Sequence, residues 1–221
     1  MIPALLIWFG KKYILPKLQK RKSQAAKPVA CLVLIALLAC TLSLQAQTKT
    51  YQIKRNDQVI GKMLFNQQAD GENLYLKITS QVNTRFVFKV DVQTEDLAHF
   101  KNGKLISSDV NRTVNGRTKE RKKTIFRAEG YQLQCGSKQQ SFNKPSIAYN
   151  MMLLYSMEPA NIGQVYSDNF QCFVPIKKSA PHQYRITLPD GNYNDYFFEN
   201  GICRLVIVNH SLYTIKMELV S

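Results

Sequence analysis

An aspartate, a cysteine and a histidine lie within NDYFFENGICRLVIVNH, the segment from Asn194 to His210. A thiol activated by an imidazole, with a carboxylate to orient the ring, is a common nucleophilic arrangement in enzymes. Cys203 and His210 are seven positions apart in a predicted strand, so they lie on opposite faces and about 23 Å apart along it. We therefore reject a catalytic site within this segment and predict that Cys203 belongs to the core.

The Asn-Gly pair in this segment predicts a two-residue type I′ turn, which determines how the two strands of the hairpin pair. With that turn, Tyr196 lies opposite Leu205. Arg204 then lies near Glu199 and Asp195, where we expect a cluster of charges on the exposed face.

A second candidate site is a group of carboxylates, Asp91, Glu95 and Asp96. Two carboxylates set across a cleft can act as acid and base in hydrolysis. Asp91 and Glu95 share one face of a predicted strand, but no GxSxG or other nucleophile motif accompanies them. A secreted hydrolase using acidic residues near Asp91 is therefore kept as an alternative function, and we assign no catalytic residue.

No metal or cofactor site is predicted. The sequence contains no CxxC, HxH or HExxH motif, and its three histidines are scattered. A site that combines a histidine with a cysteine would form only if the fold brought together residues far apart in the sequence. The histidines are His99, His182 and His210.

A basic segment, RTVNGRTKERKK, runs from Arg112 to Lys123 with one acid, Glu120. It is either a site for an anionic headgroup or glycan, or a solvated hairpin tip that protects a sheet edge from pairing, and we favour the tip. Nucleic acid is not expected as a partner, because no aromatic residues interleave the charges. The basic patch comprises Arg112, Arg117, Lys119, Arg121, Lys122 and Lys123.

Residues 1–46 resemble an export leader. They hold seven Lys or Arg and no acid, and a basic stretch precedes an apolar run that ends in small residues. We predict cleavage after Ala46; lipidation of Cys40 or an uncleaved anchor are the alternatives. The protein is then periplasmic or extracellular, and the leader or a lipid can hold it near the membrane.

The remainder, residues 47–221, is predicted to be one domain. The chain has 30 basic and 15 acidic residues; without the seven of the leader, 23 basic residues remain and the net charge is +8. In an oxidising compartment the cysteines left in the domain either form one disulfide with one free thiol or are all buried and reduced. We favour the second state for Cys135, Cys172 and Cys203.

Repeated turn signals indicate a meander of antiparallel strands. Asn-Gly and Asp-Gly pairs separate segments in which apolar and polar residues alternate, such as 74–82 and 85–93. Ser80 and Ser108 interrupt the apolar faces. We predict an all-β fold, with a strongly curved sheet that forms a barrel or half-barrel.

One helix is predicted at about residues 145–157, where apolar residues recur at helical spacing after Pro145. It should pack on the inner face of the sheet. Its methionines act either as core filler, which we favour, or as the lining of a flexible ligand pocket. The residues of that candidate pocket are Met151, Met152, Tyr155, Phe86 and Phe88.

The segments FVPIKK, HQYRITLPDGNYNDYFFENGIC and VNHSLYTI resemble an exported bacterial family known as domain of unknown function 6134. VFKVDVQTEDLAHFKNGKLISSDVNRTVNG is similar to its N-terminal half. The resemblance implies a periplasmic or secreted β-rich protein, and it implies no activity.

These observations favour a non-enzymatic exported protein that binds an apolar or amphiphilic envelope ligand within a curved sheet. Its expected partner is a lipid, another amphiphile or an envelope protein. A purely structural envelope component is a further alternative.

Overall fold

The computed structural model describes residues 46–85, 89–128, 130–144 and 146–221. The predicted leader lies outside these ranges, except for Ala46. In the described residues, fourteen strands form one antiparallel sheet, which confirms the predicted all-β meander. In chain order the strands are β1 (Ala46–Arg55), β2 (Gln58–Asp70), β3 (Asn73–Arg85), β4 (Lys89–Lys101), β5 (Lys104–Val114), β6 (Arg117–Arg127), β7 (Gly130–Cys135), β8 (Lys138–Phe142), β9 (Gln164–Ser167), β10 (Cys172–Ala180), β11 (Gln183–Thr187), β12 (Tyr193–Glu199), β13 (Ile202–His210) and β14 (Tyr213–Leu219).

The strand order shows that the sheet is open. Each strand pairs with its neighbour in the sequence, except that β8 and β9 are the two ends of the sheet. The first and last strands are joined, because β1 pairs with β14 through Tyr51 opposite Leu219 and Ile53 opposite Met217. The sheet is therefore barrel-like without being a closed barrel.

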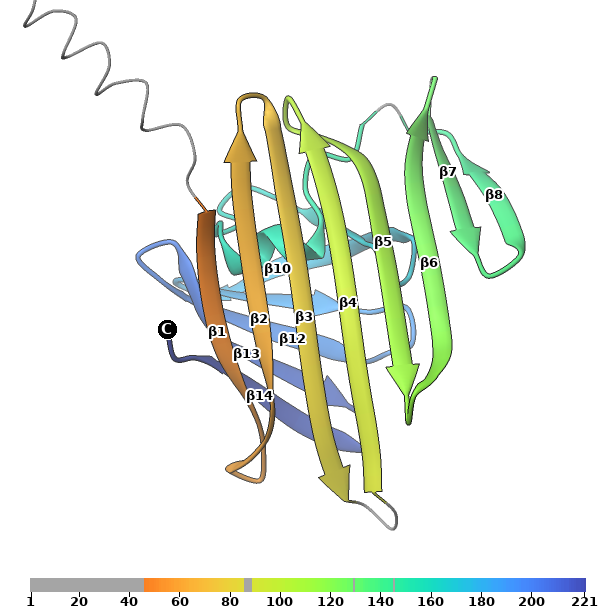
Figure 1. Ribbon diagram of the computed structural model, residues 1–221. Helices are drawn as coiled ribbons and strands as arrows, with labels where there is room; N and C mark the ends of the chain where they lie inside the picture. The colour runs from red at the N-terminus through yellow and green to blue at the C-terminus, as the bar shows by residue number, and fades with distance from the viewer. Residues whose placement is uncertain (1–45, 86–88, 129, 145) are drawn as a thin grey trace, which may run out of the picture. The chain divides into compact units, whose positions relative to one another are not determined.

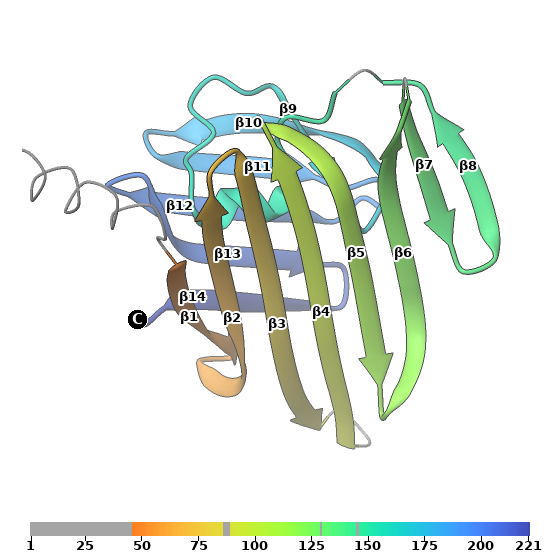
Figure 2. The same ribbon diagram turned by 45° about the horizontal axis from the view of Figure 1, so that its top comes forward.

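The curved sheet folds over itself, so that its two halves face each other. In Figures 1 and 2, β2 to β6 form one layer, and β10 to β14 cross behind it. The faces turned toward each other carry the buried hydrophobic residues, as expected for crossed sheet layers with a common core. The largest fully buried side chains include Tyr51, Phe65, Phe100, Leu105, Tyr166, Ile186 and Tyr196.

Asn-Gly turns determine the pairing of three hairpins. Asn102, Asn115 and Asn200 have φ of 50°, 50° and 52°, and the glycine after each has φ between 72° and 75°. These positive φ values at both central residues define the type I′ turn that the sequence predicted. A further turn, Asn56-Asp57, has φ of 49° and 61° without a glycine, and it was missed for that reason.

The predicted helix at 145–157 was wrong. The described residues contain no α-helix, and only the 3-10 helix η2 (Met151–Tyr155) lies in this segment. It does lie between the two layers (Figure 1) and buries four of its five residues.

Backbone contacts explain why the segment before η2 is not helical. Leu105 N–H donates to the carbonyl of Ile147 (2.8 Å), and Tyr166 N–H donates to the carbonyl of Tyr149 (3.0 Å). The Ile147 N–H donates in turn to the hydroxyl of Tyr131 (2.9 Å). Backbone groups that a helix would pair internally are therefore bonded to β5, β7 and β9, which apolar spacing alone cannot reveal.

In the described part of the chain, no helix is long and apolar enough to span a membrane.

Candidate functional site

A cavity of about 240 Å³ lies between the two layers, beside η2. Four methionines line it, two from η2 and one each from β2 and β14. It also contains polar side chains from β3, β4, β9 and β12. A mixed lining of this kind is typical of small-molecule sites, although the volume is below their usual range.

Asp96 is the carboxylate that β4 contributes to this cavity. It lies on the same face of the strand as Ala98 and Phe100, which are buried in the core. Its cross-strand neighbours are Ile78 and Val110. Burial, together with the nearby carboxylate of Asp168, raises the pKa of Asp96 to about 7. This carboxyl group therefore titrates near neutral pH.

Asp168 is the second carboxylate of the cavity, and it lies in the turn after β9. Asn150, the N-cap of η2, donates from Nδ2 to Asp168 Oδ2 over 2.9 Å. Burial raises the pKa of Asp168 to about 6, while hydrogen bonds from Ser108 and Asn150 oppose that rise. The turn thus places an acidic group against the start of η2.

Three buried acceptor oxygens, on residues that line this cavity, lack a hydrogen-bond donor among the described residues. They are Oδ1 of Asp96, Oδ1 of Asp168 and Oδ1 of Asn194. A buried acceptor without a donor costs roughly 1–3 kcal/mol. The cavity is therefore suited to a molecule that brings donor groups, and a cation gains most because the carboxylates are partly ionised at neutral pH.

Other polar groups of the cavity are already paired. The hydroxyl groups of Ser80 and Thr94 lie 2.6 Å apart, and burial raises the pKa of the Tyr196 hydroxyl. Tyr155 of η2 is also buried beside the cavity, and burial raises its pKa strongly. These groups position the cavity wall and supply no ionised base near pH 7.

Comparison with known families assigns the chain to one of them. Residues 51–220 match the family described as Domain of unknown function (DUF6134). The chain belongs to this family. The predicted resemblance is confirmed, and the match includes all the residues of the cavity.

A solved structure shares the DUF6134 fold of this chain. It is the β-barrel-like protein of Domain of Unknown Function DUF1849 from Brucella abortus, with a TM-score of 0.54 and 10% sequence identity. The match covers 81% of this chain and 97% of that one. At this identity the likeness concerns the fold alone. No curated protein matches the chain.

The predicted pocket residues are divided by the structure. Met151, Met152 and Tyr155 line the cavity, whereas Phe86 and Phe88 lie outside the described residues. Whether these residues bind a ligand stays a prediction. Asp96 was named among the acidic residues but was not assigned to the inner face of its strand. The alternation through Val90 and Val92 already indicated that face.

The acidic residues near Asp91 do not converge on one cleft. Asp91 and Glu95 project from the face of β4 opposite to Asp96, and Glu95 forms an ion pair with Lys77 (2.7 Å). Asp168 carried no sequence signal, because a turn residue far along the chain has no periodicity to place it. The serine at position 108, which interrupts the apolar face, was the available hint.

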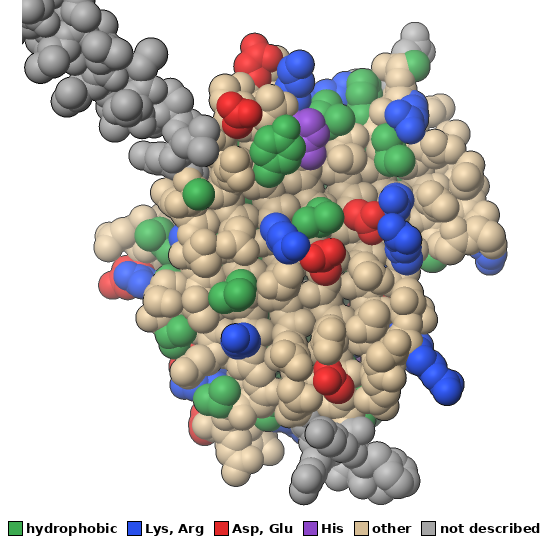
Figure 3. Space-filling model, in the orientation of Figure 1, with side chains coloured by type: hydrophobic (Ala, Val, Ile, Leu, Met, Phe, Trp, Pro, Cys, Tyr) green, Lys and Arg blue, Asp and Glu red, His purple; other side chains and the backbone are tan. Residues whose placement is uncertain are grey.

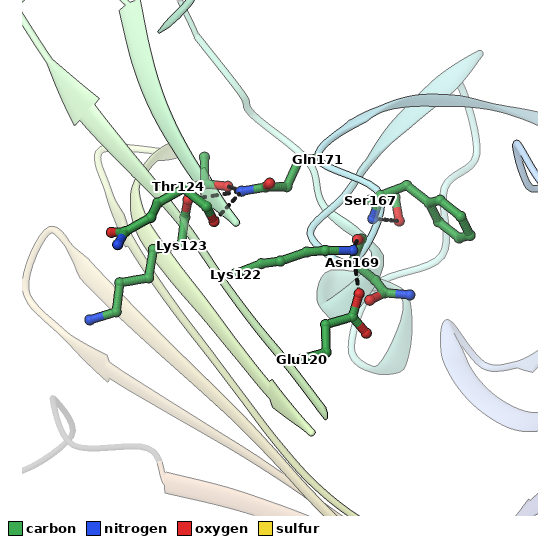
Figure 4. Close-up of polar contacts among 9 residues, drawn as sticks. Glu120, Lys122, Lys123, Thr124, Ser167, Asn169 and Gln171 are labelled. Atoms are coloured by element: carbon green, nitrogen blue, oxygen red, sulfur yellow. Dashed lines mark hydrogen bonds and ion pairs between the residues drawn. The ribbon is translucent and has the colours of Figure 1, made fainter. Parts of the chain in front are cut away.

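The six residues of the basic patch do not form one surface. Arg112, Arg117 and Lys119 are exposed near the end of the β5–β6 hairpin. Arg121 and Lys123 lie 3.6 and 3.1 Å from Asp109. Lys122 instead contacts Glu120 (2.5 Å) and the carbonyl of Asn169, as Figure 4 shows.

Lys122 belongs to a seam of side chains between β6 and the turn after β9 (Figure 4). Gln171 Nε2 donates to the carbonyl of Lys123 (2.8 Å) and lies 3.3 Å from the carbonyl of Gln134. The hydroxyl groups of Thr124 and Tyr166 lie 2.9 Å apart. This seam joins the two halves where no backbone ladder does, and it positions the turn that carries Asp168.

The cysteine–histidine hypothesis is rejected for a partly different reason. A bulge in β13 pairs Tyr196 with Val206 and not with Leu205, so Cys203 and His210 project to the same side but from opposite ends of the strand. Cys203 is fully buried, and burial raises the pKa of its thiol to about 12. His210 stacks on Tyr213.

The charges predicted around Arg204 pair differently from expectation. Arg204 contacts Glu199 (3.0 Å), but Asp195 forms its ion pair with Arg185 (2.7 Å).

All three cysteines of the described residues are free thiols, and Cys135 is exposed, so the expectation that all three are buried was wrong. Within the described residues, no cluster of three or more His, Cys, Asp or Glu side chains is arranged to hold a metal.

Proposed function

We propose that the protein binds a small amphiphile through the acidic cavity beside η2. The polar end of this ligand is an amine or another group rich in hydrogen-bond donors, and its short apolar part contacts the methionines. The observation that carries the proposal is that three residues lining one cavity, Asp96, Asp168 and Asn194, each have a buried oxygen without a donor. The cavity volume argues for a ligand much smaller than a membrane lipid.

The test compares three ligands of one length: hexylamine, hexanol and hexanoic acid. Binding is measured as the shift in unfolding temperature of protein produced from the full chain, because a ligand that binds only the folded state stabilises it. We expect the amine to stabilise most and the acid least. Equal shifts for all three, or none, would reject the proposal.

Matched variants locate the binding. Asp96→Asn should remove most of the preference for the amine, whereas Asp91→Asn should retain it. Both changes remove one carboxylate from β4, but Asp91 projects from the other face. A loss of preference in both variants would indicate a general effect of charge.

A second candidate function is general acid–base hydrolysis. Two carboxyl groups with pKa values of about 7 and about 6 in one cavity favour it, because such groups exchange protons near neutral pH. Hydrolysis of a panel of nitrophenyl glycosides and esters would then show a pH profile that Asp96→Asn abolishes. Activity unchanged in that variant would rule this mechanism out.

We also propose that the protein works in the cell envelope after export. The basic and apolar leader and the oxidising compartment that it implies support this location. The mass of the protein from an envelope fraction tests it: cleavage leaves an N-terminus at Gln47, and lipidation leaves an acylated Cys40. An unmodified full chain in the cytoplasmic fraction would contradict export.

A further inference from the structure

A second concave region crosses the outer face of the first layer, on the opposite side of the sheet from the acidic cavity. It is a groove of about 700 Å³ with lining residues from each of β1 to β6. Figure 3 shows this face, on which hydrophobic and charged side chains are scattered among uncharged polar ones. Six neighbouring strands span about 24 Å, so the groove is long enough for an extended molecule.

An aromatic platform lies in this groove. The rings of Tyr75 and His99 stack with centroids 4.5 Å apart and an angle of 11°, and His99 Nε2 lies 2.8 Å from Asn73 Oδ1, which holds the imidazole. Tyr75 is 43% exposed and Leu97 is 40% exposed. Since His99 covers one face of the tyrosine ring, the other face is the part available to a ligand.

The charges of the groove are neutralised internally. Lys77 pairs with Glu95 (2.7 Å), and Lys123 pairs with Asp109 (3.1 Å). The remaining polar lining consists of hydroxyl and carboxamide groups. They include Thr48, Asn66, Gln68 and Ser107.

A neutral ligand with many hydroxyl groups and flat C–H faces matches this combination. We propose that the groove binds a neutral oligosaccharide, with one sugar ring packed on Tyr75. An acidic polymer would find its cations already paired, and an apolar chain would leave the carboxamides unsatisfied. The site is independent of the acidic cavity, because the two lie on opposite faces of the same strands.

Calorimetric titration with cello-, malto-, xylo- and chito-oligosaccharides tests the proposal on protein produced from the full chain. We expect one of these series to bind, with little dependence on salt. Tyr75→Ala should weaken that binding about tenfold, as expected for losing an aromatic contact of roughly 1.4 kcal/mol. Tyr75→Trp should preserve it.

The chain provides a matched control. Tyr213 stacks on His210 with the same centroid distance of 4.5 Å and an angle of 6°, but it does not line the groove. Tyr213→Ala should therefore bind sugar like the unchanged protein. Binding of none of the four series, equal loss in both alanine variants, or binding that salt abolishes would each overturn the proposal. Retained hexylamine binding in Tyr75→Ala separates this result from the fate of the acidic cavity.

Discussion

Asp96 differs from Asp91 and Glu95 in the face of β4 from which it projects. Glu95 forms an ion pair with Lys77, whereas Asp96 lies between Ile78 and Val110 of the adjacent strands and near Asp168. The same residue type therefore has two roles on one strand. Alternation could have assigned Asp96 to the interior from the sequence, but the partner carboxylate depends on a turn that only the fold brings close.

The raised pKa values predict how stability depends on pH. Both carboxyl groups bind protons more tightly in the folded state, with pKa values of about 7 and about 6 against an ordinary value of 3.8. The free energy of unfolding is therefore highest at low pH within this window, and it falls as pH rises from about 4 to about 7. Urea denaturation at a series of pH values measures this decline.

Asp96→Asn should reduce that decline. The variant loses the cost of an ionised buried carboxylate, so it should be more stable than the unchanged protein by about 1–3 kcal/mol at about pH 8 and equally stable at about pH 4. Asp91→Asn is the control and should follow the unchanged protein throughout. An Asp96→Asn variant that is less stable at both pH values would contradict the assigned cause.

The elements show where sequence patterns succeed and fail. Asn-Gly pairs predicted three hairpins because positive φ at two consecutive positions is a local requirement. The helix prediction was wrong because the backbone groups at the start of that segment form hydrogen bonds with β5, β7 and β9. Between β9 and β10 the chain makes a turn in which Gln171 has φ of 53°, and no Asn-Gly or Asp-Gly pair marks this turn in the sequence.

Asn150 is the residue on which η2 and the acidic cavity both depend. Its Oδ1 accepts from Leu153 N–H (3.2 Å), and its Nδ2 donates to Asp168 (2.9 Å). Asn150→Ala should lower the free energy of unfolding by about 2–4 kcal/mol, because it removes a cap and a hydrogen bond to a carboxylate. It should also raise the pKa of Asp168 further, since that bond lowers it.

Denaturation and carboxyl titration by NMR measure these two effects. Asn169→Ala is a suitable control, because Asn169 is exposed and adjacent to Asp168, and its backbone carbonyl still accepts from Lys122. If both variants lose the same stability, the loss arises from the turn in general and not from the bonds of Asn150.

At the scale of the whole molecule, the open sheet must hold its two ends together without a ladder. A structure with 10% identity reaches a TM-score of 0.54, so the barrel-like shape tolerates very different sequences. Local periodicity predicted the strands, but it cannot predict which distant side chains join β6 to β9 and to the turn after it. The seam in Figure 4 therefore had no sequence signature, although its residues decide where Asp168 lies.

Gln171→Ala tests whether the seam holds the two halves together. The side chain donates to carbonyls of two strands, Lys123 on β6 and Gln134 on β7. Its removal takes one donor from each of these part-buried carbonyls and should cost about 1–2 kcal/mol. Because the loss is local, hydrogen exchange should accelerate in β6, β9 and β10 before it does in β1 to β4.

Gln139→Ala serves as the matched control for that experiment. Gln139 is exposed on β8 and accepts a hydrogen bond from Gln132, so its loss should leave both stability and exchange unchanged. Weaker binding of hexylamine in Gln171→Ala, with Asp96 and Asp168 intact, would link the seam to the cavity through the turn. If hydrogen exchange accelerates equally in all strands, the two halves open as one unit and the seam does not stabilise one region locally.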